Sequence, residues 1–209
     1  MAESASSNIA LVVGLGNPGA EYTDTRHNVG FWFVDELARR GGGIFRNQSK
    51  FAGEVTDATI AGHRIRLLKP TTFMNRSGQS VVATAHFYRI DVAQLLIAHD
   101  EIDLPLGDIR LKRGGGHGGH NGIRDIISKT GSPNFLRLRL GVGHPGTKER
   151  VTGHVLGRAT QSDREQIEAA FERVFERMDD LLGGDVDRVM NSLHRKPKKK
   201  SPPPETDSP

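Results

Sequence analysis

Cysteine is absent from this chain of 209 residues, which excludes disulfide bonds, thiolate metal ligands and a cysteine nucleophile. No apolar run approaches the roughly 18 residues that a membrane-spanning helix needs, so we expect no membrane contact. Residues 1–8 hold neither a basic residue nor an apolar stretch, which argues against a secretory signal and predicts a flexible N-terminus. Gly-x-Ser-x-Gly is also missing, and with it the nucleophile elbow of serine hydrolases. These absences favour a soluble protein of the cytoplasm.

The positive charge of the chain is concentrated at its C-terminus. The formal net charge is +4, but residues 195–209 contain five basic and two acidic side chains and carry most of it. Because the rest of the chain is nearly neutral, overall charge is weak evidence for nucleic-acid binding, and a local basic patch would be stronger evidence. Residues 195–209 are also rich in proline and lack apolar anchors, which predicts a disordered basic, proline-rich tail.

Apolar β-branched runs and helical patterns alternate along residues 9–194, which predicts one α/β domain there. Its sheet should be mixed, largely parallel and twisted, with helices flanking it. Ser162 and Glu165 form a capping box before an apolar stripe that reaches Leu182, so one long helix is expected. Asn121 can cap a shorter helix. The other expected strands are 9–15, 51–60, 64–69, 94–98, 109–112 and 135–142, and the other helices are 29–40 and 77–88.

Residues 14–19 spell Gly-x-Gly-x-x-Gly straight after the first predicted strand, and Asp35 follows at the distance known from dinucleotide-binding proteins. That site needs a helix that opens inside the glycine run, but residues 20–26 have no apolar helical pattern. Pro18 also lacks the backbone N–H that could hold a phosphate. We therefore interpret the segment as a rigid turn that presents Asn17, and a nucleotide-binding oxidoreductase is the last of our alternatives.

Ester hydrolysis at neutral pH needs a base for water, a group that orients the base, and donors for the developing oxyanion. His27 lies between the glycine turn and a predicted helix, and Asp100 follows a buried strand. Open α/β sheets bind their ligands at the carboxyl ends of such strands. Asn17, Asn75 and Asn121 also follow predicted strands or close a glycine-rich loop, although asparagine is common in turns. These residues alone indicate a hydrolase or a small-ligand binder.

Six short blocks together resemble bacterial-type peptidyl-tRNA hydrolase, in the order known from that family. They are GLGNPG at 14–19, TRHN at 25–28, KPTTFMN at 69–75, AHDE at 98–101, GGGHGGHNG at 114–122 and LGVGHPG at 140–146. The resemblance covers about residues 9–193. It implies a monomeric enzyme that hydrolyses the ester between peptide and tRNA in peptidyl-tRNA released prematurely from the ribosome. Its partner would be peptidyl-tRNA, and it would need no metal and no cofactor.

The resemblance also implies roles for single residues. His27 would be the general base, held in its basic form by Asp100, and Asn17 would help to distinguish N-blocked peptidyl-tRNA from aminoacyl-tRNA. Water, not a side chain, would attack the ester carbonyl. The implied substrate-binding residues are Tyr22, Phe73, Met74, Asn75, His120 and Asn121, of which the two asparagines hold the peptide backbone and the oxyanion and His120 lies at a mobile gate.

Basic residues cluster around the second glycine-rich segment. We expect Arg110, Lys112 and Arg139 to contact tRNA phosphates, which would fix the position of the RNA without reading its sequence. Arg113, Arg124 and Arg137 lie in the same part of the chain. A solvated basic face is the plainer interpretation of the cluster.

Two further alternatives remain. A metal-dependent hydrolase could use imidazole and carboxylate ligands from His117, His120, His99 and Asp100, although the glycines between the first two would give poor preorganisation. A tRNA-binding protein without catalytic activity could share the fold. The presence of His27 and Asp100 together with three asparagines favours catalysis.

Overall fold

The structure, a computed structural model, describes residues 8–194. The predicted tail at 195–209 and all but the last residue of the predicted flexible N-terminus lie outside the described residues. Within residues 8–194 no helix has the length and apolarity needed to cross a membrane.

The core of the protein is a mixed seven-stranded sheet in the order β2-β3-β4-β1-β5-β7-β6. The central strands β4, β1, β5 and β7 pair in parallel, and the remaining neighbours pair antiparallel. This arrangement confirms the predicted fold class. The strands are β1 (Leu11–Gly14), β2 (Arg46–Gln48), β3 (Gly53–Ile60), β4 (His63–Pro70), β5 (Leu95–Glu101), β6 (Ile109–Arg113) and β7 (Leu136–Gly141).

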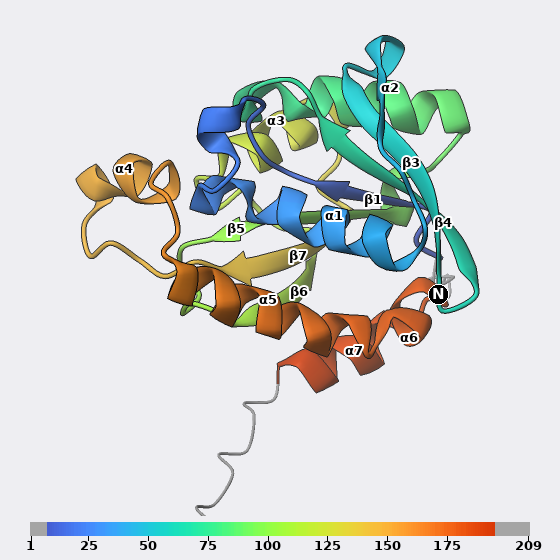
Figure 1. Cartoon of the computed structure of the whole chain (residues 1–209). Coiled ribbons are helices and arrows are strands. Elements are labelled where there is room, and N and C mark those ends of the chain that lie inside the picture. The colour runs from blue at the N-terminus through green and yellow to red at the C-terminus, as the bar shows by residue number, and fades with distance from the viewer. Residues whose placement is uncertain (1–7, 195–209) are drawn as a thin grey trace, which may run out of the picture.

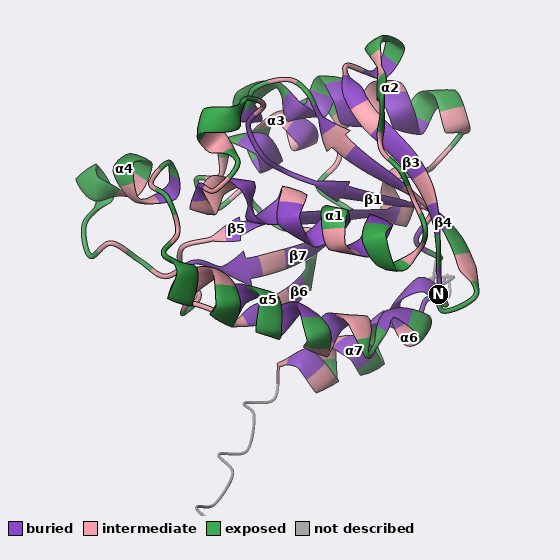
Figure 2. Cartoon of the chain, in the orientation of Figure 1, coloured by how far each residue is buried: buried purple, intermediate pink, exposed green. Residues whose placement is uncertain are grey.

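Helices cover both faces of the sheet (Figure 1). On one face pack α1 (Val29–Arg40), α5 (Gln161–Phe175), α6 (Met178–Leu182) and α7 (Val186–Leu193), and on the other α2 (Ser77–Tyr88) and α3 (Asn121–Thr130). The short helix α4 (Val151–Val155) stands apart from both layers (Figure 1). In β1, Val12 joins the first core and Leu11 and Val13 the second, because successive side chains of a strand point to opposite faces. The central strands are therefore buried on both sides (Figure 2).

The C-terminal helix differs from the prediction. Its capping box is formed by Thr160 and Asp163, not by Ser162 and Glu165: the Thr160 hydroxyl accepts from the Asp163 N–H at 3.1 Å, and the carboxylate accepts from the Thr160 N–H at 3.2 Å. Thr160 wins because its backbone is extended, as a cap requires, whereas Ser162 is already helical. The helix also breaks before Met178, so two helices carry the apolar stripe.

Two glycines, Gly14 at the end of β1 and Gly30 in α1, allow α1 to lie close to the sheet. A Cβ atom on Gly14 would lie 2.2 Å from the Gly30 carbonyl oxygen, and one on Gly30 would lie 2.4 Å from the Ala98 carbonyl oxygen. The turn leads into a 3-10 turn at Ala20–Tyr22, and α1 starts only at Val29. Without a helix N-terminus at the glycines, the segment does not form a dinucleotide site.

We expect Gly30→Ala to destabilise the protein by about 3 kcal/mol, because the methyl group would overlap backbone atoms of Leu15, just after β1, and of Ala98 in β5, which cannot move aside. Gly153→Ala is the matched control, since a Cβ atom there meets nothing within 4 Å and alanine favours the helix. Urea unfolding measures both. Equal stability of the two variants would contradict the close approach.

Candidate active site

A cleft of about 670 Å³ opens where the parallel strands end. All but one of the residues predicted to act on substrate line it: Asn17, His27, Phe73, Met74, Asn75, Asp100, His120 and Asn121. The exception is Tyr22, whose ring packs edge-on against Phe73 with centroids 6.3 Å apart. The cleft also has a wall from α4 and the residues beside it, which the sequence analysis did not identify.

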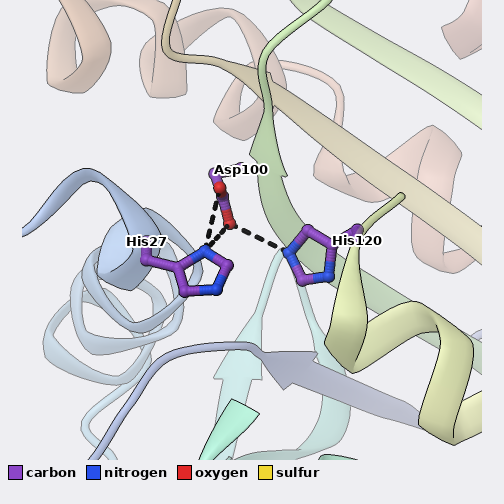
Figure 3. Close-up of side chains that lie close together, drawn as sticks. All are labelled: His27, Asp100 and His120. Carbon is purple, nitrogen blue, oxygen red and sulfur yellow. Dashed lines mark hydrogen bonds and ion pairs between the residues drawn. The ribbon is translucent and has the colours of Figure 1, made fainter. Parts of the chain in front are cut away.

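His27 and Asp100 form a hydrogen-bonded pair (Figure 3). His27 lies in the 3-10 turn η2 (Arg26–Asn28), and its Nδ1 is 2.9 and 3.0 Å from the two carboxylate oxygens of Asp100 on β5. An ionised carboxylate only accepts hydrogen bonds, so Nδ1 carries the proton. This leaves Nε2 of His27 with a free lone pair, as a general base requires.

His120 contacts the same carboxylate from the other side (Figure 3), with its Nε2 2.9 Å from Asp100 Oδ1. Its Nδ1 accepts from the backbone N–H groups of Gly122 and Ile123 at 3.1 and 3.3 Å. His120, not Asn121, is therefore the cap of α3, which corrects our prediction. Because Nδ1 must accept, the proton of the neutral ring lies on Nε2 and is donated to Asp100.

The surroundings of this group shift two pKa values. Burial raises the pKa of Asp100, but the charges and hydrogen bonds of His27 and His120 outweigh it and hold the pKa well below 3.8. Burial lowers the pKa of His27, but the charge and hydrogen bond of Asp100 outweigh burial and raise the pKa above 6.5. Asp100 is therefore an anion at neutral pH, and it strengthens His27 as a proton acceptor.

His99 has no such role. Its Nδ1 donates to the Asp100 backbone oxygen at 2.7 Å, and its ring packs edge-on against that of His120 with centroids 4.8 Å apart. Burial, reinforced by His120 and Arg137 and opposed by Asp100, lowers the pKa of His99 to about 3. His99 is a neutral group that supports the site from behind.

The group His27, Asp100 and His120 has the composition of a metal site, and its potential ligand atoms lie within 4.8 Å of one another. A metal-bound histidine uses one ring nitrogen as ligand and donates the N–H of the other. In His120 the second nitrogen instead accepts two backbone N–H groups, so Nε2 has no free lone pair for a metal. His117 lies outside this group and accepts at Nδ1 from the Gly119 N–H. The arrangement therefore fits a hydrogen-bonded group better than the metal-dependent alternative.

Asn17 is held in place by Asn28, a residue that the sequence analysis missed. The Asn28 side chain accepts from the Asn17 N–H and donates to the Asn17 carbonyl oxygen, both at 2.9 Å. The Asn17 side-chain oxygen accepts from the Met74 N–H at 2.8 Å, which fixes the orientation of the amide. The NH₂ group of Asn17 is thus the part of the amide left to donate to a ligand. The sequence signal for Asn28 was its place beside His27 in the TRHN block.

Asn75 and Asn121 reach the cleft from two other elements. Asn75 lies in the 3-10 turn Met74–Arg76 after β4, and Asn121 is the first residue of α3. Both are exposed and line the cleft. Each amide can donate or accept, so together with Asn17 they can bind a peptide backbone.

The predicted phosphate contacts lie on the edge strand β6 and on its neighbour β7, outside the cleft. Arg110 and Arg139 are cross-strand neighbours; Arg110 donates to the His194 carbonyl oxygen at 3.0 Å, and Arg139 pairs with Glu101 at 2.8 Å. Lys112 is exposed. Arg137 is buried and donates to the carbonyl oxygens of Gly115 and Gly116, both at 2.6 Å, so it holds the glycine-rich loop instead of facing solvent.

The fold and the site define an open α/β protein with a histidine–aspartate pair at the carboxyl edge of its sheet. Among the described residues that line the cleft there is no serine or cysteine that could serve as a nucleophile.

Comparisons with known proteins specify the family. The family model for peptidyl-tRNA hydrolase matches residues 11–202. The peptidyl-tRNA hydrolase of Acinetobacter baumannii is 54% identical over 188 residues, 90% of this chain and 97% of that protein. That of Alcanivorax borkumensis is 54% identical over 89% of this chain and 96% of its own length. A crystal structure of the A. baumannii enzyme superposes with a TM-score of 0.86 at 53% identity, covering 91% of this chain and 97% of that one. The chain belongs to the peptidyl-tRNA hydrolase family.

We expect Asp100→Asn to lower the pKa of His27 below 6.5. The substitution removes the charge that raises this pKa, whereas burial, which lowers it, remains. An NMR titration of the His27 ring measures the change. Asp35→Asn, at a half-exposed carboxylate paired with Lys69, is the control and should leave the value unchanged. A pKa that stays the same or rises in the Asp100 variant would contradict the proposed balance.

Proposed function

We propose that this protein hydrolyses the ester bond between peptide and tRNA in peptidyl-tRNA, with His27 as general base and without a covalent intermediate. The observation that carries the proposal is the His27–Asp100 pair, which leaves His27 Nε2 free in a cleft lined by three asparagines. Membership of the peptidyl-tRNA hydrolase family supports peptidyl-tRNA as the substrate. The proposal includes residues 9–194 as the hydrolase domain and action as a cytoplasmic monomer on peptidyl-tRNA released prematurely from the ribosome.

The reaction begins when His27 Nε2 takes a proton from a water molecule in the cleft. The water oxygen bonds to the ester carbonyl carbon, and the amides of Asn75 and Asn121 donate to the resulting oxyanion. Collapse of this intermediate breaks the bond between the carbonyl carbon and the ribose oxygen, which receives the proton from His27. The peptide leaves with a free carboxyl group, and the tRNA leaves with a ribose hydroxyl.

Asp100 contributes by orientation and charge. It holds the His27 ring with the free nitrogen toward the cleft and stabilises the imidazolium that forms during the attack, as the aspartate of a serine hydrolase triad does. The raised pKa of His27 makes it a stronger proton acceptor, at the cost of some neutral imidazole near pH 7. Asn17, held by Asn28 and Met74, is in place to contact the blocked amino group of the peptide.

The tRNA would lie across the edge strand β6 and its neighbour β7. Arg110, Lys112 and Arg139 would bind its backbone phosphates, which positions the substrate without selecting a sequence. Arg139 is partly neutralised by Glu101, so the exposed Lys112 should contribute most of this attraction.

The first experiment is the release of peptide from N-acetyl-aminoacyl-tRNA with EDTA present. We expect intact protein to cleave, and His27→Ala to lose activity on the order of 10³-fold while remaining folded, because the variant has no proton acceptor at this position. His86→Ala, at an exposed histidine, is the control.

Substantial activity of the His27 variant would contradict the assigned base. Loss of cleavage in EDTA would return the metal-dependent alternative. Binding of the tRNA without cleavage by intact protein would favour the alternative of a non-catalytic tRNA-binding protein.

For the phosphate contacts we expect Lys112→Gln to raise KM for the tRNA substrate several-fold and to reduce the slope of log affinity against log salt by about 1. Arg46→Gln is the control, because Arg46 lies on β2 at the opposite edge of the sheet. Affinity that does not change between low and moderate salt would remove the patch from the proposal.

A further inference from the structure

One wall of the cleft is formed by a short helix, α4, and the residues beside it. The apolar side chains of Val151, Val155 and Leu156, on and beside α4, line the cleft, and Leu156 is 40% exposed. α4 projects from the body at the end of the segment that follows β7 (Figure 1), and much of its surface faces solvent (Figure 2). A side-chain contact to the body is the hydrogen bond of His154 Nε2 to the Val142 carbonyl oxygen at 3.0 Å. A helix of five residues does not hold its own position, so its contacts with the body decide where this wall lies.

Several of these contacts come from Arg26, the residue before His27. Its Nη1 donates to the carbonyl oxygens of His154, Gly157 and Arg158 at 3.4, 3.5 and 3.1 Å, at the C-terminal end of α4. Its Nη2 donates to Asp163 at 2.6 Å. One guanidinium group thus hydrogen-bonds to both the end of α4 and the start of α5.

Backbone contacts also join the segment before His27 to the segment after α4. The Arg26 N–H donates to the Gly157 carbonyl oxygen at 3.2 Å, and the Ala159 N–H donates to the Asp24 carbonyl oxygen at 2.9 Å. Thr25 and Arg158 form an antiparallel bridge between them. The segment that carries His27 and the segment that follows α4 therefore lie side by side. The Arg26 and Asp163 side chains are only 15% and 20% exposed, so solvent screens this pair less than a surface ion pair.

Consecutive residues of the turn η2 serve different parts of the site. Arg26 holds the end of α4, His27 holds the carboxylate of Asp100, and Asn28 holds Asn17. The arginine is the one whose contacts run away from the catalytic pair. Its loss should therefore move the wall without breaking the bond between His27 and Asp100.

We infer that Arg26 is a positioning residue that holds the α4 wall beside His27, so that Val151, Val155 and Leu156 can bind apolar side chains of the peptide. This inference rests on the proposed function. Lysine could not replace Arg26 fully. A single ammonium group lacks the planar fork with which the guanidinium reaches both the carbonyl oxygens after α4 and the Asp163 carboxylate.

The test is a double-mutant cycle with an N-acetylated, apolar dipeptidyl-tRNA as substrate. Arg26→Gln should raise KM about tenfold and change kcat less than about threefold, because the wall moves while the catalytic pair stays. Leu156→Ala should raise KM a few-fold. The double variant should be no worse than Arg26→Gln alone, since both changes remove the same contact.

Controls separate positioning from folding. Arg158→Gln removes an exposed ion pair with Asp24 and should leave KM unchanged. Arg26→Lys should restore part of the loss, which keeps the test available if Arg26→Gln does not fold. The pH profile of kcat should be the same in every variant, because the environment of His27 is kept.

Three results would overturn the inference. KM of the double variant could rise by the product of the two single increases, KM of Arg26→Gln could stay unchanged, or the loss could be confined to kcat. Failure of the unmodified protein to cleave would instead contradict the proposed function itself.

Discussion

A carboxylate buried at the end of a central strand costs several kcal/mol unless hydrogen bonds reach it, and Asp100 is only 4% exposed. Two imidazole N–H groups provide these bonds. They come from segments far apart in the chain, the turn before α1 and the loop before α3. The buried charge of the Asp100 carboxylate is therefore stabilised only when both segments are in place. The same contacts orient the His27 ring with its free nitrogen toward the cleft. The arrangement of the site follows from satisfying this one anion.

Other polar groups around the cleft are also held in place by hydrogen bonds between paired donors and acceptors. Asn28 holds both backbone groups of Asn17, whose side chain then holds the backbone of Met74. The buried Arg137 holds two successive carbonyl groups of the glycine-rich loop. A buried polar group with several hydrogen-bond partners has a well-defined position. The amides that face a ligand are therefore placed by neighbours that never touch it.

The sequence predicted what local patterns control. The periodicity of apolar residues located α1 and α2 with their observed bounds, and the ends of the strands located His27, Asp100 and Asn17 in one cleft. It did not predict the bond of His120 to Asp100, the support of Asn17 by Asn28 or the wall formed by α4. Each of these depends on contacts between distant segments, which no local pattern records. The shifted capping box had another cause, because Ser162 is by residue type the better cap and only backbone geometry favours Thr160.

The fixed tautomer of His120 has a consequence for the movement of protons. Its Nδ1 accepts two N–H groups of α3 and its Nε2 proton is committed to Asp100, so the ring has nothing to pass on. Asp100 accepts hydrogen bonds from both histidines, and among the described residues no side-chain hydrogen bond leads from its carboxylate into the interior. The proton that His27 gains must leave by the side from which it came. His27 therefore gains its proton from the cleft and returns it to the cleft in each catalytic cycle.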